Sequence, residues 1–353
     1  NEESMRIAII PGDGIGKEVI AEAVRVLEAA ESAFGFSIEK TELDWGADRY
    51  LRDGTTLPDG AVEMFQNEYD AILLGAVGDP RVPDNRHAAD ILLGLRFKLD
   101  LYINLRPVKL LADSLTPLKG RTCADVDFVV FRENTEGLYT FMGGIFKKGT
   151  PDEVAIQEEV NTRKGVERII EAAFEFAERA GRKKVTLADK SNAMTYGHDL
   201  WRRAFREVAD RHPSIQTNAQ YIDATAMFMV LDPGQFDVIV TNNLFGDIIT
   251  DLGAALQGGL GVAGSGNIHP GKVSLFEPVH GSAPQFAGKN IANPIGSVLA
   301  AGLMLEHLGQ QAAADAVERA VVAAIGDGKI TKDVGGSLST TEAGAAIAER
   351  VRA

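Results

Sequence analysis

Short apolar segments alternate with longer amphipathic segments along most of this 353-residue chain. The apolar segments have the length and composition of buried strands, and the segments between them repeat apolar residues at helical spacing. The predicted strand and helix pairs are Ile7–Ile10 with Gly16–Ala33, Phe128–Phe131 with Thr162–Arg179, Val185–Leu187 with Gly197–Arg211, and Val238–Thr241 with Phe245–Gln257, and Ala71–Leu74 is a further strand. This alternation predicts an α/β fold in which helices cover the sheets.

Two regions depart from the alternation. Phe141–Glu158 contains glycines, lysines and a run in which apolar and polar residues alternate, which is typical of a protruding hairpin or arm. Such an arm often forms part of a dimer interface. From Ala292 to Ala353 the pattern is almost entirely helical, with Gly335 and Gly336 as its main break.

The charge of the chain narrows the choice of partners. A net charge of −14 argues against nucleic acid or an anionic membrane surface, so an anionic substrate would need a local cluster of arginines. The apolar runs, such as Ala71–Val77, are far shorter than the roughly 18 residues of a membrane span. The single Cys123 cannot form an intrachain disulfide, and Met5–Ile10 is strand-like instead of resembling a signal peptide. We therefore expect a cytoplasmic protein.

Asp247 and Asp251 are four residues apart in the helix that follows Val238–Thr241. This spacing places the two carboxylates one above the other on a single helix face, close to a strand end, where α/β proteins place their sites. Hard oxygen ligands of this kind suit Mg²⁺ or Mn²⁺. The alternative is a solvated acidic face, and the apolar Ile248 and Ile249 between the two aspartates weaken it.

Three arginines, Arg96, Arg106 and Arg132, each lie in or next to an apolar stretch. A buried guanidinium needs an anionic partner, so each arginine alone is explained by a structural salt bridge. The three together, in an acidic protein, fit a carboxylate-binding pocket better. Lys190 follows the strand Val185–Leu187, and a lysine near carboxylates and a metal can act as a general base, although its position equally fits a surface lysine.

No standard nucleotide-binding motif is complete. Gly12 and Gly14 begin a G-x-G-x-x-G pattern, but Lys17 stands where the third glycine is required. Gly259–Gly264 satisfies the pattern but follows a helix instead of a strand, and Gly266–Val273 misses a Walker loop at its last residue. A loop rich in Gly, Pro, Ser and Asn, Leu275–Pro294, is too long for a simple turn.

Taken together, these segments resemble the β-decarboxylating dehydrogenases, which act on isopropylmalate, isocitrate, homoisocitrate, and tartrate or D-malate. The resemblance runs from about Met5 to the end and is carried by Gly12–Gly16, Leu95–Arg96, Asn104–Pro107, Arg132–Tyr139, Asp189–Asn192, Asn243–Asp251 and His280–Pro284. It implies a two-domain α/β fold that is not a Rossmann fold, with mixed sheets flanked by helices and a dimerisation arm at residues 141–160. The first domain would comprise residues 1–104 and 263–353, and the second residues 105–262.

The resemblance also implies roles for individual residues. Arg96, Arg106 and Arg132 would bind the carboxylate that leaves as CO₂. Asp247 and Asp251, joined by Asp223 from a second subunit, would hold Mg²⁺ or Mn²⁺, and Asp223 would also bind the substrate, so that a homodimer would share its active sites. Lys190, also from the second subunit, would relay the proton of the C2 hydroxyl, and Tyr139 would protonate the enolate. The residues implied for the nicotinamide cofactor are Asn192, Glu277, His280, Gly281, Ser282, Ala283, Pro284, Gln285 and Asn293.

Substrate choice within the resemblance depends on Leu92 and Leu93, just before Arg96. A leucine pair suits an isopropyl group, which predicts metal-dependent, NAD-linked oxidative decarboxylation of (2R,3S)-3-isopropylmalate to 2-oxo-4-methylpentanoate in leucine biosynthesis. The alternative for the pair is a helix face packed in the core. Alternative substrates are tartrate or D-malate, then homoisocitrate or isocitrate, and a non-catalytic metal-binding paralogue is the remote alternative. Many isopropylmalate enzymes carry a glutamate shortly before the leucines, whereas this chain has Ala88–Asp90 there.

The cofactor expected from the resemblance is NAD. Relatives that use NAD usually place an aspartate after the Gly-Ser-Ala-Pro segment, and relatives that use NADP place a lysine there, whereas this chain has the neutral Gln285. The tyrosine that accompanies that lysine is also absent, because Phe286 lacks a hydroxyl. The sequence therefore predicts NAD, with a weaker discrimination against NADP.

Overall fold

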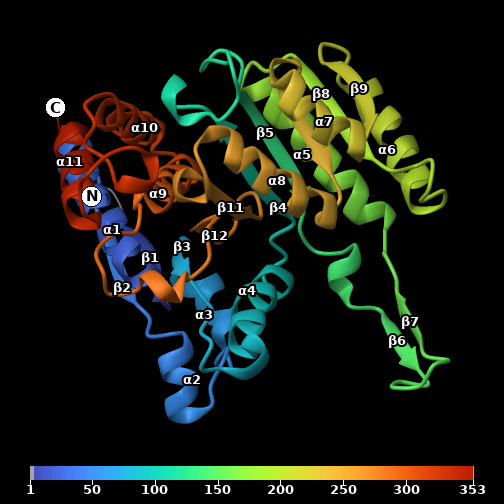
Figure 1. The fold of residues 1–353 in the computed structure, drawn as a ribbon, viewed down its shortest axis with the longest axis horizontal. Coiled ribbons are helices and arrows are strands. Elements are labelled where there is room, and N and C mark those ends of the chain that lie inside the picture. Colours follow the sequence, from blue (N-terminus) through green and yellow to red (C-terminus); the bar gives the residue numbers. More distant parts are fainter. Residues whose placement is uncertain (1–3, 353) are drawn as a thin grey trace. The chain divides into compact units, whose positions relative to one another are not determined.

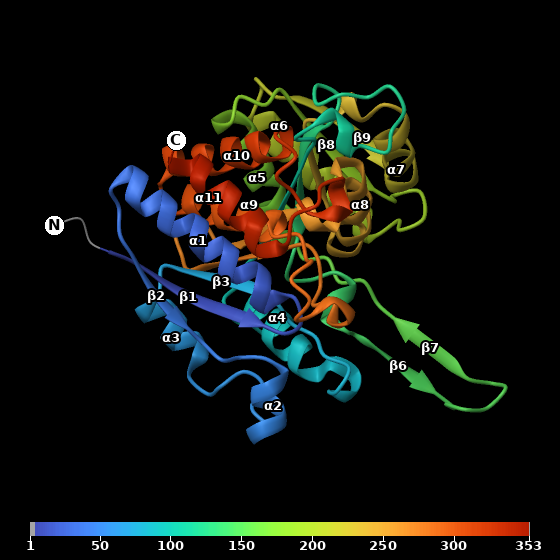
Figure 2. The ribbon, with the colours of Figure 1, turned by 60° about the vertical axis from the view of Figure 1, so that its left-hand side comes forward.

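The structure is a computed structural model that describes residues 4–352, and these form two compact units (Figures 1 and 2). Unit 1 comprises the chain up to Leu101, Lys109–Cys123 and the chain from Ala254 onward, and unit 2 comprises Tyr102–Val108 and Ala124–Gly253. Short 3₁₀ helices connect the longer elements at Pro83–Asn85, Asp113–Leu115, Leu138–Thr140, Pro233–Gln235, Leu260–Val262, Pro284–Phe286 and Lys332–Val334.

Unit 1 contains a mixed sheet with its strands in the order β2, β1, β3, β12, β11. The strands are β1 (Met5–Gly12), β2 (Ile38–Glu42), β3 (Ala71–Ala76), β11 (Gly264–Ile268) and β12 (Ser274–Pro278). The first four in spatial order are parallel, and β11 runs antiparallel to β12. All six residues of β3 are buried, as expected for a parallel strand that is covered on both faces.

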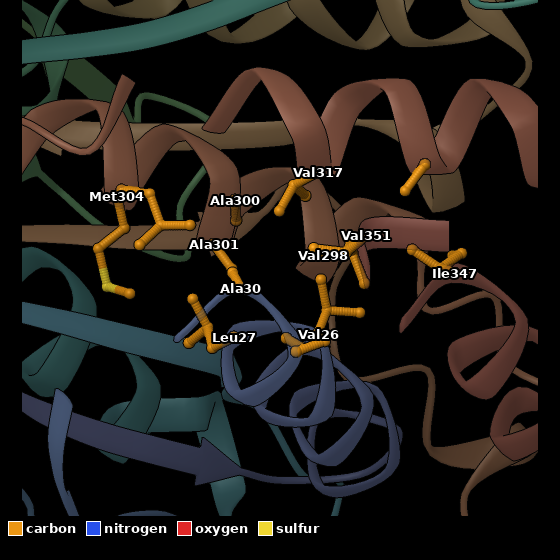
Figure 3. Close-up of a cluster of buried hydrophobic side chains, with 14 of the residues drawn as sticks. Val26, Leu27, Ala30, Val298, Ala300, Ala301, Met304, Val317, Ile347 and Val351 are labelled. Carbon is orange, nitrogen blue, oxygen red and sulfur yellow. The ribbon is translucent and has the colours of Figure 1, made fainter. Parts of the chain in front are cut away.

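Alternate residues of the central strands face two different cores. Ile7 and Leu73 belong to a cluster formed with α1 (Gly16–Phe34), α9 (Ile295–His307), α10 (Gln311–Gly326) and α11 (Thr340–Arg352). Figure 3 shows Val26, Leu27 and Ala30 of α1 beside residues of these three helices. Ile10 and Leu74 instead pack with residues of α3 (Ala61–Glu68) and α4 (Arg86–Lys98), and α2 (Ala47–Asp53) precedes these helices in the chain. The period of two along each strand thus assigns the helices to opposite faces of the sheet.

In unit 2 the strands lie in the order β4, β5, β10, β8, β9. The strands are β4 (Ile103–Lys109), β5 (Asp127–Glu133), β8 (Lys184–Asp189), β9 (Gln216–Tyr221) and β10 (Val238–Thr241), and the last four in spatial order are parallel. The helices are α5 (Arg163–Arg179), α6 (Gly197–Arg211), α7 (Ile222–Leu231) and α8 (Asn243–Gln257). The connections β5-α5-β8 and β8-α6-β9 both advance toward β9, whereas β9-α7-β10 runs back toward β5. Because parallel crossovers are right-handed, α5 and α6 lie on one face of these strands and α7 lies on the other.

A hairpin of β6 (Gly143–Phe146) and β7 (Val154–Gln157) extends from unit 2, as Figures 1 and 2 show. Its strands are exposed, and its outward apolar side chains include Phe141, Ile145 and Phe146. The protruding hairpin that the sequence predicted is therefore present. That the hairpin takes part in a dimer interface remains a prediction.

The predicted elements agree with the structure to within a few residues, and the α/β fold with a mixed sheet is confirmed. Two stretches of the predicted second domain, Lys109–Cys123 and residues 254–262, belong instead to unit 1. The physical reason is packing: Leu111 and Leu115 lie against the core of unit 1, and the Lys109 ammonium pairs with Glu318 of α10. The predicted domain limits were drawn without that contact. Within residues 4–352, no helix is both long and apolar enough to cross a membrane.

Candidate active site

The parallel strands of unit 2 bring the predicted site residues to one edge of the sheet. In the strand register Arg132 of β5 lies opposite Thr241 of β10, and Asp189 of β8 lies opposite Tyr221 of β9. The carboxyl ends of parallel strands meet at the same edge, where α/β proteins place their ligands. The segments that follow these ends therefore start from this edge, and they include the predicted Tyr139, Lys190, Asp223, Asp247 and Asp251.

One face of α8 organises this cluster. Asn243, Asp247 and Thr250 are four and three residues apart, so their side chains share one face of the helix, and Asp251 lies beside them. The Arg132 guanidinium, only 1% exposed, donates to Asn243 Oδ1 at 2.8 and 3.0 Å and to Asp247 Oδ1 at 2.8 Å. A buried cation is thereby paired and hydrogen-bonded, as its desolvation requires.

Arg106, the other predicted substrate-binding arginine of unit 2, is held by the same helix. Arg106 is buried and donates to Thr250 Oγ1 at 2.9 Å and to Asn104 Oδ1 at 3.1 Å. Both of these acceptors are neutral oxygens, an amide and a hydroxyl, and they fix the orientation of the planar guanidinium.

Tyr139 meets the same aspartate from the segment after β5. Its hydroxyl donates to Asp247 Oδ2 at 3.0 Å, and the Arg132 guanidinium carbon lies 5.4 Å from the centre of its ring. Asp247 thus accepts from Arg132 at one oxygen and from Tyr139 at the other. A phenol whose proton is held on a carboxylate beside a fixed cation can serve as a proton donor.

Lys190 and Asp223, which follow β8 and β9, form a separate pair. The Lys190 ammonium donates to Asp223 Oδ1 at 2.6 Å, and Nζ lies 5.6 Å from the centre of the Tyr221 ring. The hydrogen bond from Lys190 lowers the pKa of Asp223, which is exposed and stays ionised. The structure therefore brings together the two residues that the resemblance assigns to a second subunit.

The carboxylates of α8 offer part of a metal site. Asp247 and Asp251 present hard oxygens one helical turn apart, which suits Mg²⁺ or Mn²⁺. Among residues 4–352, no ion pair or hydrogen bond engages the Asp251 carboxylate, which is exposed. No three His, Cys, Asp or Glu side chains of this part of the chain are grouped to hold a metal. The carboxylate oxygens of Asp247 and Asp251 suit the ion, and α8 presents these two of the three predicted metal ligands.

Gly246 allows Arg132 to approach α8, and we expect Gly246→Ala to destabilise the protein by about 2 kcal/mol. A Cβ at this position would lie 2.6 Å from Arg132 Cβ, so the arginine would be displaced from Asn243 and Asp247. Urea unfolding measures the effect. Gly326→Ala is the matched control, because this glycine ends α10 with no atom near its Cβ position, and there alanine should stabilise by up to about 1 kcal/mol. Equal effects of the two substitutions would contradict the close approach.

Unit 1 carries the remaining predicted residues. Arg96 of α4 donates to Glu277 Oε1 of β12 at 3.2 Å, which joins a predicted substrate residue to a predicted cofactor residue. Leu92 packs against the core cluster of α3 and α4. This agrees with the alternative interpretation of the leucine pair, a helix face packed in the core. Leu93 is half-buried, does not belong to that cluster, and lies one helical turn before Arg96. The two leucines therefore have different surroundings.

The loop after β12 is anchored to the turn after β1. Ile15 N donates to Ser282 O at 2.8 Å, and a Cβ on Gly14 would lie 2.8 Å from the Ser282 carbonyl carbon, so this turn requires glycine at φ +55°. His280 Nδ1 lies 2.9 Å from Gly281 O, whereas its buried Nε2 has no hydrogen-bond partner within the described chain. Burial lowers the pKa of His280, which keeps the ring neutral. Gly281, Pro284 and Gln285 are exposed on this loop.

A cavity of about 990 Å³ opens beside this loop in unit 1. Its lining includes the predicted His280, Ala283 and Asn293, together with Ile15, Ile291 and Leu338. A large cavity with a mostly apolar lining suits a planar heterocyclic ligand. The predicted Asn192 lies in unit 2, where it is exposed.

Several residues of the site were not predicted. Asn243, Thr250 and Asn104 hold the arginines, and the cavity uses Ile15, Ile291 and Leu338. The spacing of Asn243 and Thr250 from Asp247 was a usable signal, because it repeats on one helix face. Glu133, the neighbour of Arg132 in the sequence, was not singled out either: burial raises its pKa to about 7, and its carboxyl group accepts from the amides of Thr135 and Glu136.

The chain is similar to known proteins over almost its whole length. The family model described as isocitrate/isopropylmalate dehydrogenase matches residues 6–347. The chain is 49% identical over 350 residues to 3-isopropylmalate dehydrogenase of Thermobifida fusca, covering 99% of this chain and 98% of the relative. The corresponding values for 3-isopropylmalate dehydrogenase of Mycobacterium tuberculosis are 50% over 321 residues, 90% and 93%. The crystal structure of isocitrate dehydrogenase from Methylococcus capsulatus superposes with a TM-score of 0.89 at 39% identity, covering 99% of this chain and 100% of that one.

Proposed function

Because the chain belongs to the isocitrate/isopropylmalate dehydrogenase family, we propose that it is an oxidoreductase that converts 3-isopropylmalate by oxidation and decarboxylation, with NAD as acceptor. The observation that carries the proposal is the single face of α8, where Asp247 and Asp251 lie with Arg132 and Tyr139. This face presents ligands for a divalent cation, a fixed cation for a carboxylate, and a proton donor. Oxidative decarboxylation of a 2-hydroxy dicarboxylic acid needs all three.

Asp247 and Asp251 would hold Mg²⁺ or Mn²⁺, which when bound supplies the positive charge that favours an ionised C2 oxygen and stabilises charge after loss of CO₂. His280 and Asn293, which line the cavity, would hold NAD together with Ser282 of the same loop, and NAD when bound supplies the hydride acceptor. Arg106 and Arg132 are fixed by α8 and attract the substrate carboxylate. Arg96 is a further substrate-binding residue of the proposal.

Proton movements are assigned to Lys190 and Tyr139. Lys190, an ammonium in the pair with Asp223, must first lose a proton to solvent; its neutral amine then takes the proton of the C2 hydroxyl, and Asp223, 2.6 Å away, stabilises the ammonium that results. The Tyr139 hydroxyl gives its proton to the carbon that loses CO₂, and the neighbouring Arg132 guanidinium stabilises the phenolate electrostatically. Each group thus carries a charge or a proton that one step of the reaction requires.

The working unit of the proposal is a homodimer. Two groups of apolar side chains are exposed to solvent and would be buried by a second copy. They are Phe141, Ile145 and Phe146 at the hairpin, and Met227, Val230 and Leu231 of α7. Asp223 lies on α7 and pairs with Lys190, so a second copy that covers α7 would receive both residues in its own site. The metal set would then be completed by Asp223 of the second copy.

The substrate side of the proposal rests on Leu93 and on the relatives named 3-isopropylmalate dehydrogenase. Isocitrate is the second candidate, because a solved structure that resembles the chain at 39% identity is an isocitrate dehydrogenase. A half-buried leucine next to Arg96 offers no polar partner for a third carboxylate. An isopropyl group can instead make apolar contact with it.

NADH formation in the presence of Mn²⁺ tests the proposal, with kcat/KM compared for 3-isopropylmalate, D-malate, tartrate, isocitrate and homoisocitrate. We expect 3-isopropylmalate to be preferred by about tenfold or more, since one apolar group discriminates by that order. The same assay with NADP should give a lower kcat/KM than with NAD. A preference for isocitrate or for D-malate would overturn the substrate assignment, and activity on none of the five would overturn the proposal as a whole.

A further inference from the structure

A buried polar network lies beneath the Lys190 loop and the start of α8, and it contains no residue to which the proposed reaction gives a role. Its centre is His198, which is 1% exposed at the start of α6, and Glu159, which follows the hairpin. His198 Nε2 lies 3.2 Å from Glu159 Oε2. A titratable pair of this kind is costly to bury, so its hydrogen bonds need an explanation.

The first contact of this network is with the Lys190 backbone. The Lys190 amide donates to His198 Nδ1 at 2.8 Å, so Nδ1 accepts and the ring proton belongs on Nε2. Nε2 then donates to Glu159, which fixes the orientation of the ring. Although burial opposes a charge on Glu159, the hydrogen bonds from His198 and two asparagines hold the pKa of this carboxyl below its usual value. The acceptor for the Lys190 amide is thereby locked in one tautomer.

The second contact of the network is with the start of α8. Asn242 Nδ2 donates to Glu159 Oε1, and Asn242 Oδ1 accepts from Phe245 N at 2.9 Å, which caps the first turn of α8. The same helix carries Asp247 and Asp251. Asn161 closes the network, because it donates to Glu159 Oε2 at 3.0 Å and accepts from Trp201 Nε1 at 2.7 Å. One carboxylate thus connects the Lys190 loop, α6 and the cap of α8.

We propose that Glu159 and His198 are positioning residues, which hold the Lys190 loop and the first turn of α8 in the arrangement that the reaction needs. The inference rests on the proposed function for the roles of Lys190 and α8. Glu159 and His198 touch neither substrate nor cofactor in it. Their effect is exerted through the Lys190 amide and the Asn242 cap, and a shift of about 1 Å at a reacting group can lower a rate by about 100-fold.

Three substitutions test the pair. His198→Leu removes both hydrogen bonds of the ring, His198→Asn retains an acceptor close to the position of Nδ1, and Glu159→Gln retains shape without charge. His212→Leu is the matched control, because His212 follows the same helix α6, lies 2.6 and 2.9 Å from the carboxylates of Glu171 and Glu178, and belongs to neither the Lys190 loop nor α8. The control reports the stability lost with a buried, carboxylate-paired histidine.

Two measurements separate positioning from stability. We expect His198→Leu to lower kcat for the preferred substrate by about 10- to 100-fold while KM for NAD stays unchanged, and His198→Asn to recover most of the loss. Hydrogen exchange should become about tenfold faster at the Lys190 amide and in the first turn of α8, since each loses a hydrogen-bonded support. Glu159→Gln should give the same pattern more weakly. His212→Leu should lower the unfolding midpoint with kcat unchanged.

Unchanged exchange at the Lys190 amide in His198→Leu would overturn the inference, and so would an asparagine variant no more active than the leucine variant. An equal loss of kcat in His212→Leu would also overturn it, because general destabilisation would then explain the effect. If the wild type is inactive on all five substrates but the variants show the expected changes in hydrogen exchange, the proposed function is overturned and the positioning by Glu159 and His198 is supported.

Discussion

Replacing Lys190 by methionine is expected to lower kcat by about 10³-fold, the order of magnitude lost when a general acid or base is removed. Methionine keeps the length and apolar stem of the side chain but cannot accept a proton. It also leaves Asp223 without the ammonium that lies 2.6 Å from its carboxylate. The rate of NADH formation at saturating substrate and Mn²⁺ measures the effect, and the unfolding midpoint should stay close to that of the wild type because the ion pair is half-exposed.

Lys184→Met is the control for this result. Lys184 begins the same strand, β8, which Lys190 directly follows, so it has a similar backbone setting at the opposite end of the strand. The control variant should retain wild-type kcat. Turnover of Lys190→Met within about twofold of the wild type would remove Lys190 from the proton relay. Absence of turnover in the wild type, and not this result, would favour the alternative of a metal-binding paralogue without catalysis.

Asp251→Asn is expected to weaken Mn²⁺ binding by about 100-fold, because removing even an outer-shell group of a metal site costs up to that factor. Asp251 is the clearer choice of the two α8 aspartates. Asp247 also accepts from Arg132 and Tyr139, so its replacement would disturb both residues. Asp251 is exposed, and no ion pair or hydrogen bond of the described chain depends on it. Titration of free Mn²⁺ by electron paramagnetic resonance measures the affinity without reference to turnover.

The matched control for Asp251→Asn is Asp210→Asn, which neutralises an exposed aspartate on α6 and should leave Mn²⁺ affinity unchanged. Treatment of the wild type with a chelator should abolish NADH formation, and added Mn²⁺ should restore it. Asp251→Asn should need a higher Mn²⁺ concentration for half-maximal activity, in proportion to its weaker affinity. Wild-type affinity in Asp251→Asn would exclude this carboxylate from the metal site.

Local sequence patterns were sufficient wherever one element determined the outcome. The spacing of Asp247 and Asp251 on one helix face follows from the period of the α-helix alone, and the hairpin at Phe141–Glu158 follows from its alternating residues. The motif segments also gave the family, which the matched relatives bear out. The roles of the individual site residues remain predictions that the substitutions above address.

Long-range contacts were decided only by the tertiary structure. Nothing local to Arg106 predicts that Thr250, 144 positions later, accepts its hydrogen bond, or that Lys109–Cys123 packs in unit 1. The different surroundings of Leu92 and Leu93 also depend on which helix face meets the core of unit 1.

The chain by itself determined its α/β architecture, the acidic face of α8 and its family, because periodicity and short motifs are properties of neighbouring residues. The tertiary structure decided which side chains hold Arg106 and Arg132, and that Glu159 connects His198 with Asn242. The physical reason is that burial pairs polar groups by proximity in space, and sheet register and helix packing set that proximity.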